Sequence, residues 1–334
     1  MPPARAIVVR DVSARRRIAA FVALLALIAV AIVVVAVVSS GEDSAASPSA
    51  MKPRAGRPPL SLALGFRTDR EARALARAAA LYSYGRLGRA QAIFGRYASL
   101  EARVGAAYAT WPRGTLERLE ELANLYPKSA LVELHLGLAR LWAAQGDPEA
   151  AWRSAVDDDA DSPYSVLAGN LLHPDLPRGL PAFIPSFSAP RSVTRLPPAR
   201  QLRALHSRAE RGGAHEWILY GVGLQRVGRP VSAARAFDRA AALAPHDAQA
   251  RVAAAVGAFD KDDPTPAFAR LGPLTRVFPT NPTVRFHLGV LLLWTGRIKA
   301  AERQLRLASH IQPGSVMANE AFRYLDTIRR ARSR

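Results

Sequence analysis

The stretch that decides the fold is residues 214–245, AHEWILYGVGLQRVGRPVSAARAFDRAAALAP. Its apolar residues recur at helical spacing in two runs, which a turn at Gly228 separates. Small residues stand at Gly221 and Ala233, where two helix backbones would cross closely. Pro245 ends the second run, because proline has no N–H for the helical ladder and clashes with the preceding turn. The stretch predicts a helix-turn-helix pair.

The pattern recurs along the chain at a fixed period. Pro245, Pro279 and Pro313 lie 34 residues apart, and each follows a run of helical apolar spacing. The unit that ends at Pro313 keeps a glycine at position 289, whereas the middle unit has Ala255 at the equivalent place. One helix pair cannot bury its apolar face alone, so we expect the pairs to stack on one another.

This pattern resembles the tetratricopeptide repeat (TPR), a helix-turn-helix unit. The matching positions in the first interval are Trp217, Gly221, Gly228, Ala233, Phe237, Ala240 and Pro245. The resemblance implies an all-α fold, a TPR-like helix-turn-helix solenoid, over residues 200–332. Ser315 is expected to cap a final helix that closes the solenoid, with Val316, Phe322, Leu325 and Ile328 on its buried face.

Weaker copies of the pattern occupy residues 66–172, which we interpret as degenerate TPR-like helical repeats. Gly137 and Ala151 fit a repeat only if the turn around Ala144 is longer by two residues. Gly85 and Phe94 suggest an earlier unit. Between them, Thr115-Leu116-x-x-Leu119-x-x-Leu122 indicates a second helix whose first helix is hard to place.

The N-terminal region predicts a membrane anchor. Residues 18–38 contain no charged or polar side chain and, as a helix, match the thickness of a bilayer. Arg15-Arg16-Arg17 precede them, so the positive-inside bias makes residues 1–17 a cytoplasmic basic tail and places the repeats outside the cytoplasm. A cleaved signal peptide is the alternative, although its apolar core is usually shorter. Residues 39–65, rich in Ser, Pro and Ala, are expected to form a flexible spacer.

A Pro-rich connecting segment, residues 173–199, interrupts the helical pattern. Seven prolines exclude regular helix over most of it, while Leu180, Phe183, Ile184 and Phe187 make it too apolar for a solvated linker. One interpretation is an extended segment that packs on the side of the solenoid. The other places it in or over the repeat groove, where it occupies the binding surface or supplies part of it.

The chain is strongly basic, with a net charge of +19 from 46 Lys and Arg against 27 Asp and Glu. Such a charge attracts nucleic acid, anionic lipid headgroups or acidic polymers. The arginines are dispersed, and only Arg329-Arg330-x-Arg332-x-Arg334 forms a cluster. A composition set by a GC-rich genome is the alternative explanation, which we prefer. The predicted topology argues against nucleic acid and favours headgroups or cell-wall polyanions as contacts of the basic surface.

No catalytic residue, cofactor site or metal site is predicted. The seven histidines are scattered, cysteine is absent, and no phosphate-binding loop or nucleophile elbow occurs. Ser49-Ala50-Met51-Lys52 matches S-x-x-K by letter only. Asp157, Asp159 and Asp161 imitate the start of a calcium loop, but Ser162 and Ala168 stand where that loop needs glycine and glutamate, so an acidic turn is preferred.

Binding of a protein partner is therefore the expected function. In the resembled family the first helix of each pair lines a concave groove, and we transfer that placement residue by residue. The predicted groove residues are His215, Ile218, Val222, Gln225 and Arg226, then Gln249, Val252, Val256 and Phe259, then Thr283, Phe286, Val290, Leu293 and Trp294. The same residues could instead pack between helices. We expect a membrane-anchored, non-enzymatic scaffold that binds a protein or peptide, and a basic surface-binding module is the alternative.

Overall fold

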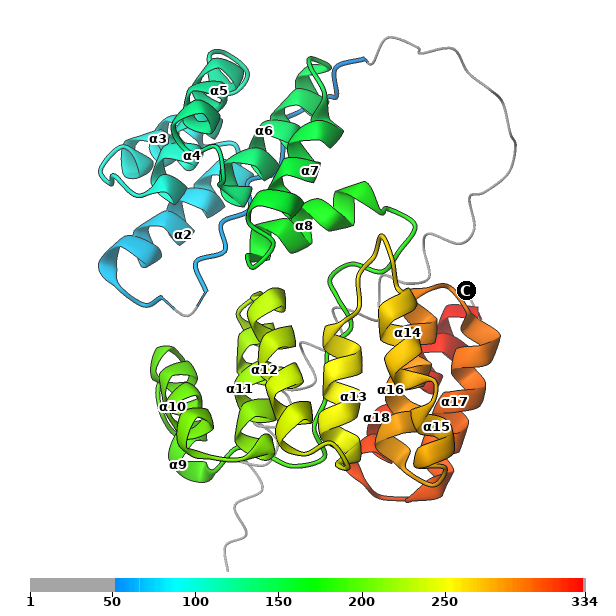
Figure 1. Cartoon of the computed structure of the whole chain (residues 1–334). Coiled ribbons are helices and arrows are strands. Elements are labelled where there is room, and N and C mark those ends of the chain that lie inside the picture. The colour runs from blue at the N-terminus through cyan, green and yellow to red at the C-terminus, as the bar shows by residue number, and fades with distance from the viewer. Residues whose placement is uncertain (1–51, 66, 333–334) are drawn as a thin grey trace, which may run out of the picture.

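The computed structural model of the chain describes residues 52–65 and 67–332 (Figure 1). In that part of the chain every regular element is a helix, and no strand occurs. The predicted all-α fold is thereby confirmed. The predicted basic tail, 1–17, and transmembrane helix, 18–38, lie outside the described residues. Among the residues that are described, no helix is both long and apolar enough to cross a bilayer.

The N-terminal half consists of helices joined by short turns, and each packs mainly on its neighbours in sequence (Figure 1). Its helices are α2 (Arg70–Ser83), α3 (Leu87–Phe94), α4 (Leu100–Tyr108), α5 (Thr115–Leu125), α6 (Ala130–Ala143), α7 (Pro148–Asp158) and α8 (Pro163–Leu172). The helix predicted around Leu119 is α5. Its first helix, which the sequence leaves unplaced, is α4.

The C-terminal half repeats this arrangement after the Pro-rich segment. Its helices are α9 (Arg191–Thr194), α10 (Pro198–Arg211), α11 (Ala214–Arg226), α12 (Pro230–Leu243), α13 (Ala248–Gly257), α14 (Thr265–Leu271), α15 (Leu274–Val277), α16 (Pro282–Trp294), α17 (Ile298–Ile311) and α18 (Val316–Arg332). Pro245, Pro279 and Pro313 each stand two residues after a helix end, as the period predicts.

Close helix crossings explain the glycines of the pattern. A Cβ atom added to Gly221 in α11 would lie 2.3 Å from the ring of Phe237 in α12. One added to Gly137 in α6 would lie 2.3 Å from the indole of Trp152 in α7. Only a residue without a side chain lets these paired helices approach so closely, because protein interiors are close-packed.

The final helix is capped as predicted, but its buried face differs from the prediction. Ser315 Oγ accepts a hydrogen bond from the Ala318 N–H. Val316 and Phe322, however, are 43% and 53% exposed, whereas Met317 and Tyr324 are buried together with Ala321 and Ile328. The prediction for Val316 and Phe322 is wrong, because α18 turns the stripe one residue away from them against α16 and α17.

The two halves meet where α8 approaches α12 and the α13–α14 turn. Asp161, just before α8, accepts hydrogen bonds from the backbone N–H and the hydroxyl of Ser232 and pairs with Arg229 at 3.3 Å. Lys261 Nζ donates to Asn170 Oδ1 at 2.6 Å and to the Pro177 carbonyl at 2.9 Å. Each half has its own hydrophobic core, and the two cores share no residue. The polar contacts described above join the two halves.

Candidate functional site

Aromatic rings form a row across alternate helices of the N-terminal half. Tyr82 of α2, Tyr108 of α4, His135 of α6 and Tyr164 of α8 follow one another, with ring centroids 5.8, 5.0 and 6.3 Å apart. The Tyr108 hydroxyl also donates to the His135 carbonyl at 2.7 Å. These helices stand at the first-helix positions of successive pairs, so the row runs along the face where a repeat groove is expected.

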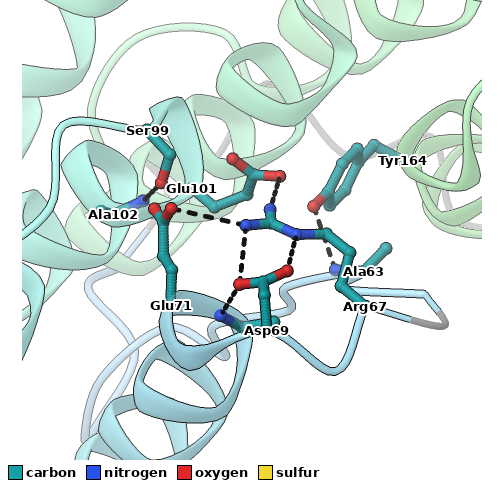
Figure 2. Close-up of polar contacts among 9 residues, drawn as sticks. Ala63, Arg67, Asp69, Glu71, Ser99, Glu101, Ala102 and Tyr164 are labelled. Carbon is teal, nitrogen blue, oxygen red and sulfur yellow. Dashed lines mark hydrogen bonds and ion pairs between the residues drawn. The ribbon is translucent and has the colours of Figure 1, made fainter.

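An extended stretch of the same chain, residues 54–64, lies on this row, and we call it the N-terminal segment. The Tyr82 hydroxyl donates to the Pro58 carbonyl at 2.6 Å. His135 Nε2 accepts the Ser61 N–H at 3.2 Å. The Tyr164 hydroxyl accepts the Ala63 N–H at 3.0 Å (Figure 2). Its leucines at positions 60, 62 and 64 pack against the N-terminal core. The helices therefore bind this segment through its backbone groups as well as its leucine side chains.

Charged contacts hold both ends of the N-terminal segment. Arg54 lies over the ring of Trp142, 5.2 Å from its centroid. Beyond the other end, Arg67 faces three carboxylates, those of Asp69 at 3.1 Å, Glu71 at 3.5 Å and Glu101 at 3.7 Å (Figure 2). The hydrogen bond to Asp69 is the main cause that raises the pKa of Arg67.

These contacts correct the predicted spacer. Residues 39–51 lie outside the described residues, but residues 54–64 pack on helices and are not a flexible linker. The Ser, Pro and Ala composition that suggested a linker is misleading here, because the hydrogen bonds use backbone groups, which every residue type carries.

The tautomer of His135 follows from its two hydrogen-bond partners. Its Nδ1 lies 2.7 Å from the Leu131 carbonyl, which can only accept, so Nδ1 carries the proton. Nε2 is then free to accept the Ser61 N–H. The ring is fully buried, and burial lowers its pKa to about 4. The histidine is therefore neutral at pH 7 and presents one buried acceptor to the extended segment.

The Pro-rich segment makes the same kind of contact in the C-terminal half. The Phe183 N–H donates to Gln225 Oε1 of α11 at 3.2 Å, and the Ile184 N–H donates to His287 Nε2 of α16 at 3.0 Å. A third backbone N–H, that of Ser186, donates to a glutamine of α13 at 2.8 Å. Of the two interpretations above, these contacts agree with the second, in which the segment lies over the first helices of the pairs.

The side chain of Phe183 anchors this segment in the core. It is 2% exposed and stacks on His287, with 4.7 Å between ring centroids. Its edge also contacts Phe237 at 5.7 Å. Like His135, His287 is fully buried with a pKa of about 4, lowered by burial. Phe187 extends the contact to His215 of α11, at 4.4 Å between centroids.

The predicted groove residues fall into two groups. Half-exposed or exposed are His215, Val222, Gln225, Arg226 and Gln249. Buried in the helical core are Ile218, Val252, Val256, Phe259, Thr283, Phe286, Val290, Leu293 and Trp294. The structure thus brings His215, Gln225 and Gln249 onto the Pro-rich segment. It places the second group where a partner cannot reach in this conformation.

Sequence reasoning missed the residues that accept backbone N–H groups, above all His135 and His287. A signal for them exists. The run HLGLARLW at positions 135–142 recurs as HLGVLLLW at positions 287–294, with His, Leu, Gly, Leu and Trp in register. The two histidines therefore occupy equivalent places in the two halves.

Comparison of the chain with protein-family models found no match, and comparison with curated proteins found none. The geometry of the site is therefore the basis for inferring what it can bind. The described residues contain no group of three or more His, Asp or Glu side chains placed to hold a metal ion. Asp161 of the predicted acidic turn binds Ser232 and Arg229. Buried neutral acceptors at His135, Tyr164 and His287 are suited to binding the backbone of an extended chain.

Proposed function

We propose that this protein is a membrane-anchored, non-enzymatic scaffold, a TPR-like helical solenoid whose repeat faces bind extended segments of protein partners. One observation carries the proposal. Both halves already hold an extended segment of their own chain on the first helices of successive pairs. The scaffold would act outside the cytoplasm, in envelope or complex assembly.

The form of the contacts supports peptide binding. Side-chain acceptors on α6, α11, α13 and α16 take backbone N–H groups of the bound segments, which yields affinity without dependence on most side chains. Between these bonds Phe183 is buried in the C-terminal core, and the leucines of the N-terminal segment pack against the N-terminal core. Main-chain bonds combined with a few side-chain anchors are the usual way in which an extended peptide is recognised.

The basic surface-binding alternative has less support. In the cluster of arginines at the end of α18, Arg332 pairs with Glu302 at 2.6 Å and Arg330 pairs with Asp326. Ion pairing reduces the charge that these side chains offer to anionic lipid or wall polymers. Steep loss of vesicle binding between low and physiological salt would favour this alternative.

A crosslinking experiment on the intact anchored protein tests the scaffold. A photoreactive amino acid is placed at Val222, half-exposed on the first helix α11, and at Leu307, 46% exposed on the second helix α17. We expect a distinct protein partner to crosslink from Val222 and not from Leu307. Equal capture at both positions would argue against partner binding on the first helices.

Topology needs a separate measurement. Fusion of a reporter to the C-terminus should report a location outside the cytoplasm, because Arg15-Arg16-Arg17 precede the predicted span. A cytoplasmic C-terminus would exclude the envelope role and reopen nucleic acid as a partner.

A further inference from the structure

The two bound segments share a short motif. Residues 56–61 read Gly-Arg-Pro-Pro-Leu-Ser and residues 179–184 read Gly-Leu-Pro-Ala-Phe-Ile. The first-position glycines, Gly56 and Gly179, have φ of 80° and 83°, a conformation that favours glycine. The two segments also share a pattern of exposure. In both, the proline at the third position is buried and the residue at the fourth position is exposed.

The two receiving sites match as well. In each segment the N–H of the sixth residue, Ser61 or Ile184, donates to Nε2 of a fully buried histidine. That histidine bonds through Nδ1 to the carbonyl four residues earlier in its own helix, at 2.7 Å for His135 and 2.8 Å for His287. Segment and site therefore recur together, although the two segments lie in different parts of the chain.

Each position of the motif has a physical reason. The glycine supplies a positive φ that other residues rarely adopt. The buried proline has no N–H that would need a partner, and its fixed φ keeps the segment extended. The apolar fifth residue, Leu60 or Phe183, packs on the helical core. The sixth residue cannot be proline, because its N–H is the group that the histidine accepts.

The N-terminal site holds its segment less firmly than the C-terminal site. Residues 60–64 are all half-exposed, whereas Phe183 is 2% exposed. Release of the N-terminal segment would leave the helix pairs of its half in contact with one another.

We propose that both halves are peptide sites for the motif Gly-x-Pro-x-(Leu/Phe)-x, with a sixth residue other than proline. We further propose that the N-terminal site exchanges its own segment for the same motif in a partner protein. This inference rests on the proposed scaffold function and names the class of partner: an extended, proline-containing apolar peptide. The chain's own segment would then act as a competitor that sets the threshold for binding.

The test uses the full chain and a fluorescent peptide with the sequence of residues 54–65, RAGRPPLSLALG. Ser61→Pro in the chain removes the N–H that His135 accepts and so weakens the resident segment, while the site itself stays intact. We expect this variant to bind the peptide at least about tenfold more tightly than the wild type, since a tethered competitor lowers the apparent affinity. Fluorescence anisotropy measures the binding.

Matched controls separate the loss of the Ser61 N–H from other effects of the substitution. Ser61→Ala in the chain keeps the N–H and should bind the peptide as weakly as the wild type. A peptide with proline in place of Ser61 should bind no variant. An unlabelled peptide with the sequence of residues 177–188 should compete, because it carries the second copy of the motif. Failure to compete would overturn the shared motif.

A separate measurement tests whether the N-terminal segment exchanges with a peptide. Hydrogen exchange at the amides of residues 54–64 shows whether Ser61→Pro frees the segment. If the segment is freed and the helices remain folded, yet no peptide binds, the exchange proposal is wrong. Self-association of the variant in place of peptide binding would also contradict it, because the occupant would be a second copy.

If Ser61→Pro does not fold, Ala63→Pro provides a second variant, since it removes the N–H that the Tyr164 hydroxyl accepts. The result for Ala63→Pro then decides the proposal by the same criteria. If no peptide binds although a partner still crosslinks from Val222, the scaffold stands and the exchange alone is overturned.

Discussion

At the scale of single residues, His135 and His287 carry the contacts between the helices and the extended segments. Each ring donates from Nδ1 within its own helix and accepts from a segment at Nε2. This arrangement requires the neutral ring, because a protonated imidazole has no acceptor. Protonation of either ring would therefore oppose the contact that it now makes.

Acidification should destabilise the protein through these two histidines. Their folded pKa of about 4 lies below the ordinary 6.5, so the unfolded chain binds more protons between these values and stability falls as pH decreases. Each histidine should contribute a loss of about 2 kcal/mol between pH 7 and pH 5. Urea unfolding at a series of pH values measures this loss.

A double variant isolates the histidines. His135→Gln with His287→Gln keeps a neutral acceptor, the role that Gln225 already has toward Phe183. The variant should lose most of the pH dependence in this range. An unchanged slope would show that other groups cause it.

The crossing of α6 and α7 at Gly137 leaves no room for a side chain. Gly137→Ala places a Cβ atom 2.3 Å from Trp152 and 2.8 Å from the Pro148 carbonyl, and should cost about 1–3 kcal/mol in urea unfolding. Gly169→Ala in α8 is the control, because no atom lies within 4 Å of the added Cβ. It should be neutral or stabilising by up to about 1 kcal/mol. Equal losses would contradict the crossing.

At the scale of elements, helix caps hold the binding residues in place. Ser162, 8% exposed, caps α8 by accepting the N–H groups of Tyr164 and Ser165, both at 3.2 Å. Tyr164 in turn accepts the Ala63 N–H of the N-terminal segment. The cap of α8 therefore positions one of the contacts that bind the segment.

Loss of this cap should loosen the segment as well as the helix. Ser162→Ala is expected to destabilise the protein by about 1 kcal/mol, the usual effect of removing a serine cap. Hydrogen exchange at the Ala63 amide should accelerate. Ser154→Ala, within α7, is the control and should leave that amide unchanged. Unchanged exchange at Ala63 in Ser162→Ala would separate the cap from the segment.

At the scale of the whole molecule, Asp161 links the two halves by capping a helix of the other half. The N-cap residue of α12, Arg229, provides no side-chain cap, and Asp161 accepts the Ser232 N–H at 2.8 Å from 71 residues away. The second link, Lys261 to Asn170 and Pro177, is half-buried, and burial lowers the pKa of Lys261 to about 8.

Removal of this cap should weaken the junction. Asp161→Ala removes the acceptor of the Ser232 N–H and hydroxyl and is expected to cost about 1–3 kcal/mol. The Ser232 amide should exchange faster while amides in α16 stay protected. Asp157→Ala, exposed on α7, should change neither. If Ser232 keeps its protection in Asp161→Ala, the junction does not depend on this contact.

Local pattern determined much of this protein. The positions of the helix pairs around Gly221 and Gly289, and the helix ends before Pro245, Pro279 and Pro313, follow from apolar spacing, small residues at crossings and the missing proline N–H. These effects act between residues that are close in sequence. For that reason the fold class was predictable, and so was the Ser315 cap.

Only the tertiary structure decided which residues meet the extended segments. Ile184 and His287 are 103 residues apart, and Ser61 and His135 are 74 apart. No local preference brings such pairs together, and every residue except proline carries a backbone N–H, so composition does not mark the donors. Composition therefore marked residues 54–64 as a linker, and helical phase alone could not tell whether Phe286 faces a partner or the core. Long-range packing placed these groups, because burial depends on what the rest of the chain puts beside them.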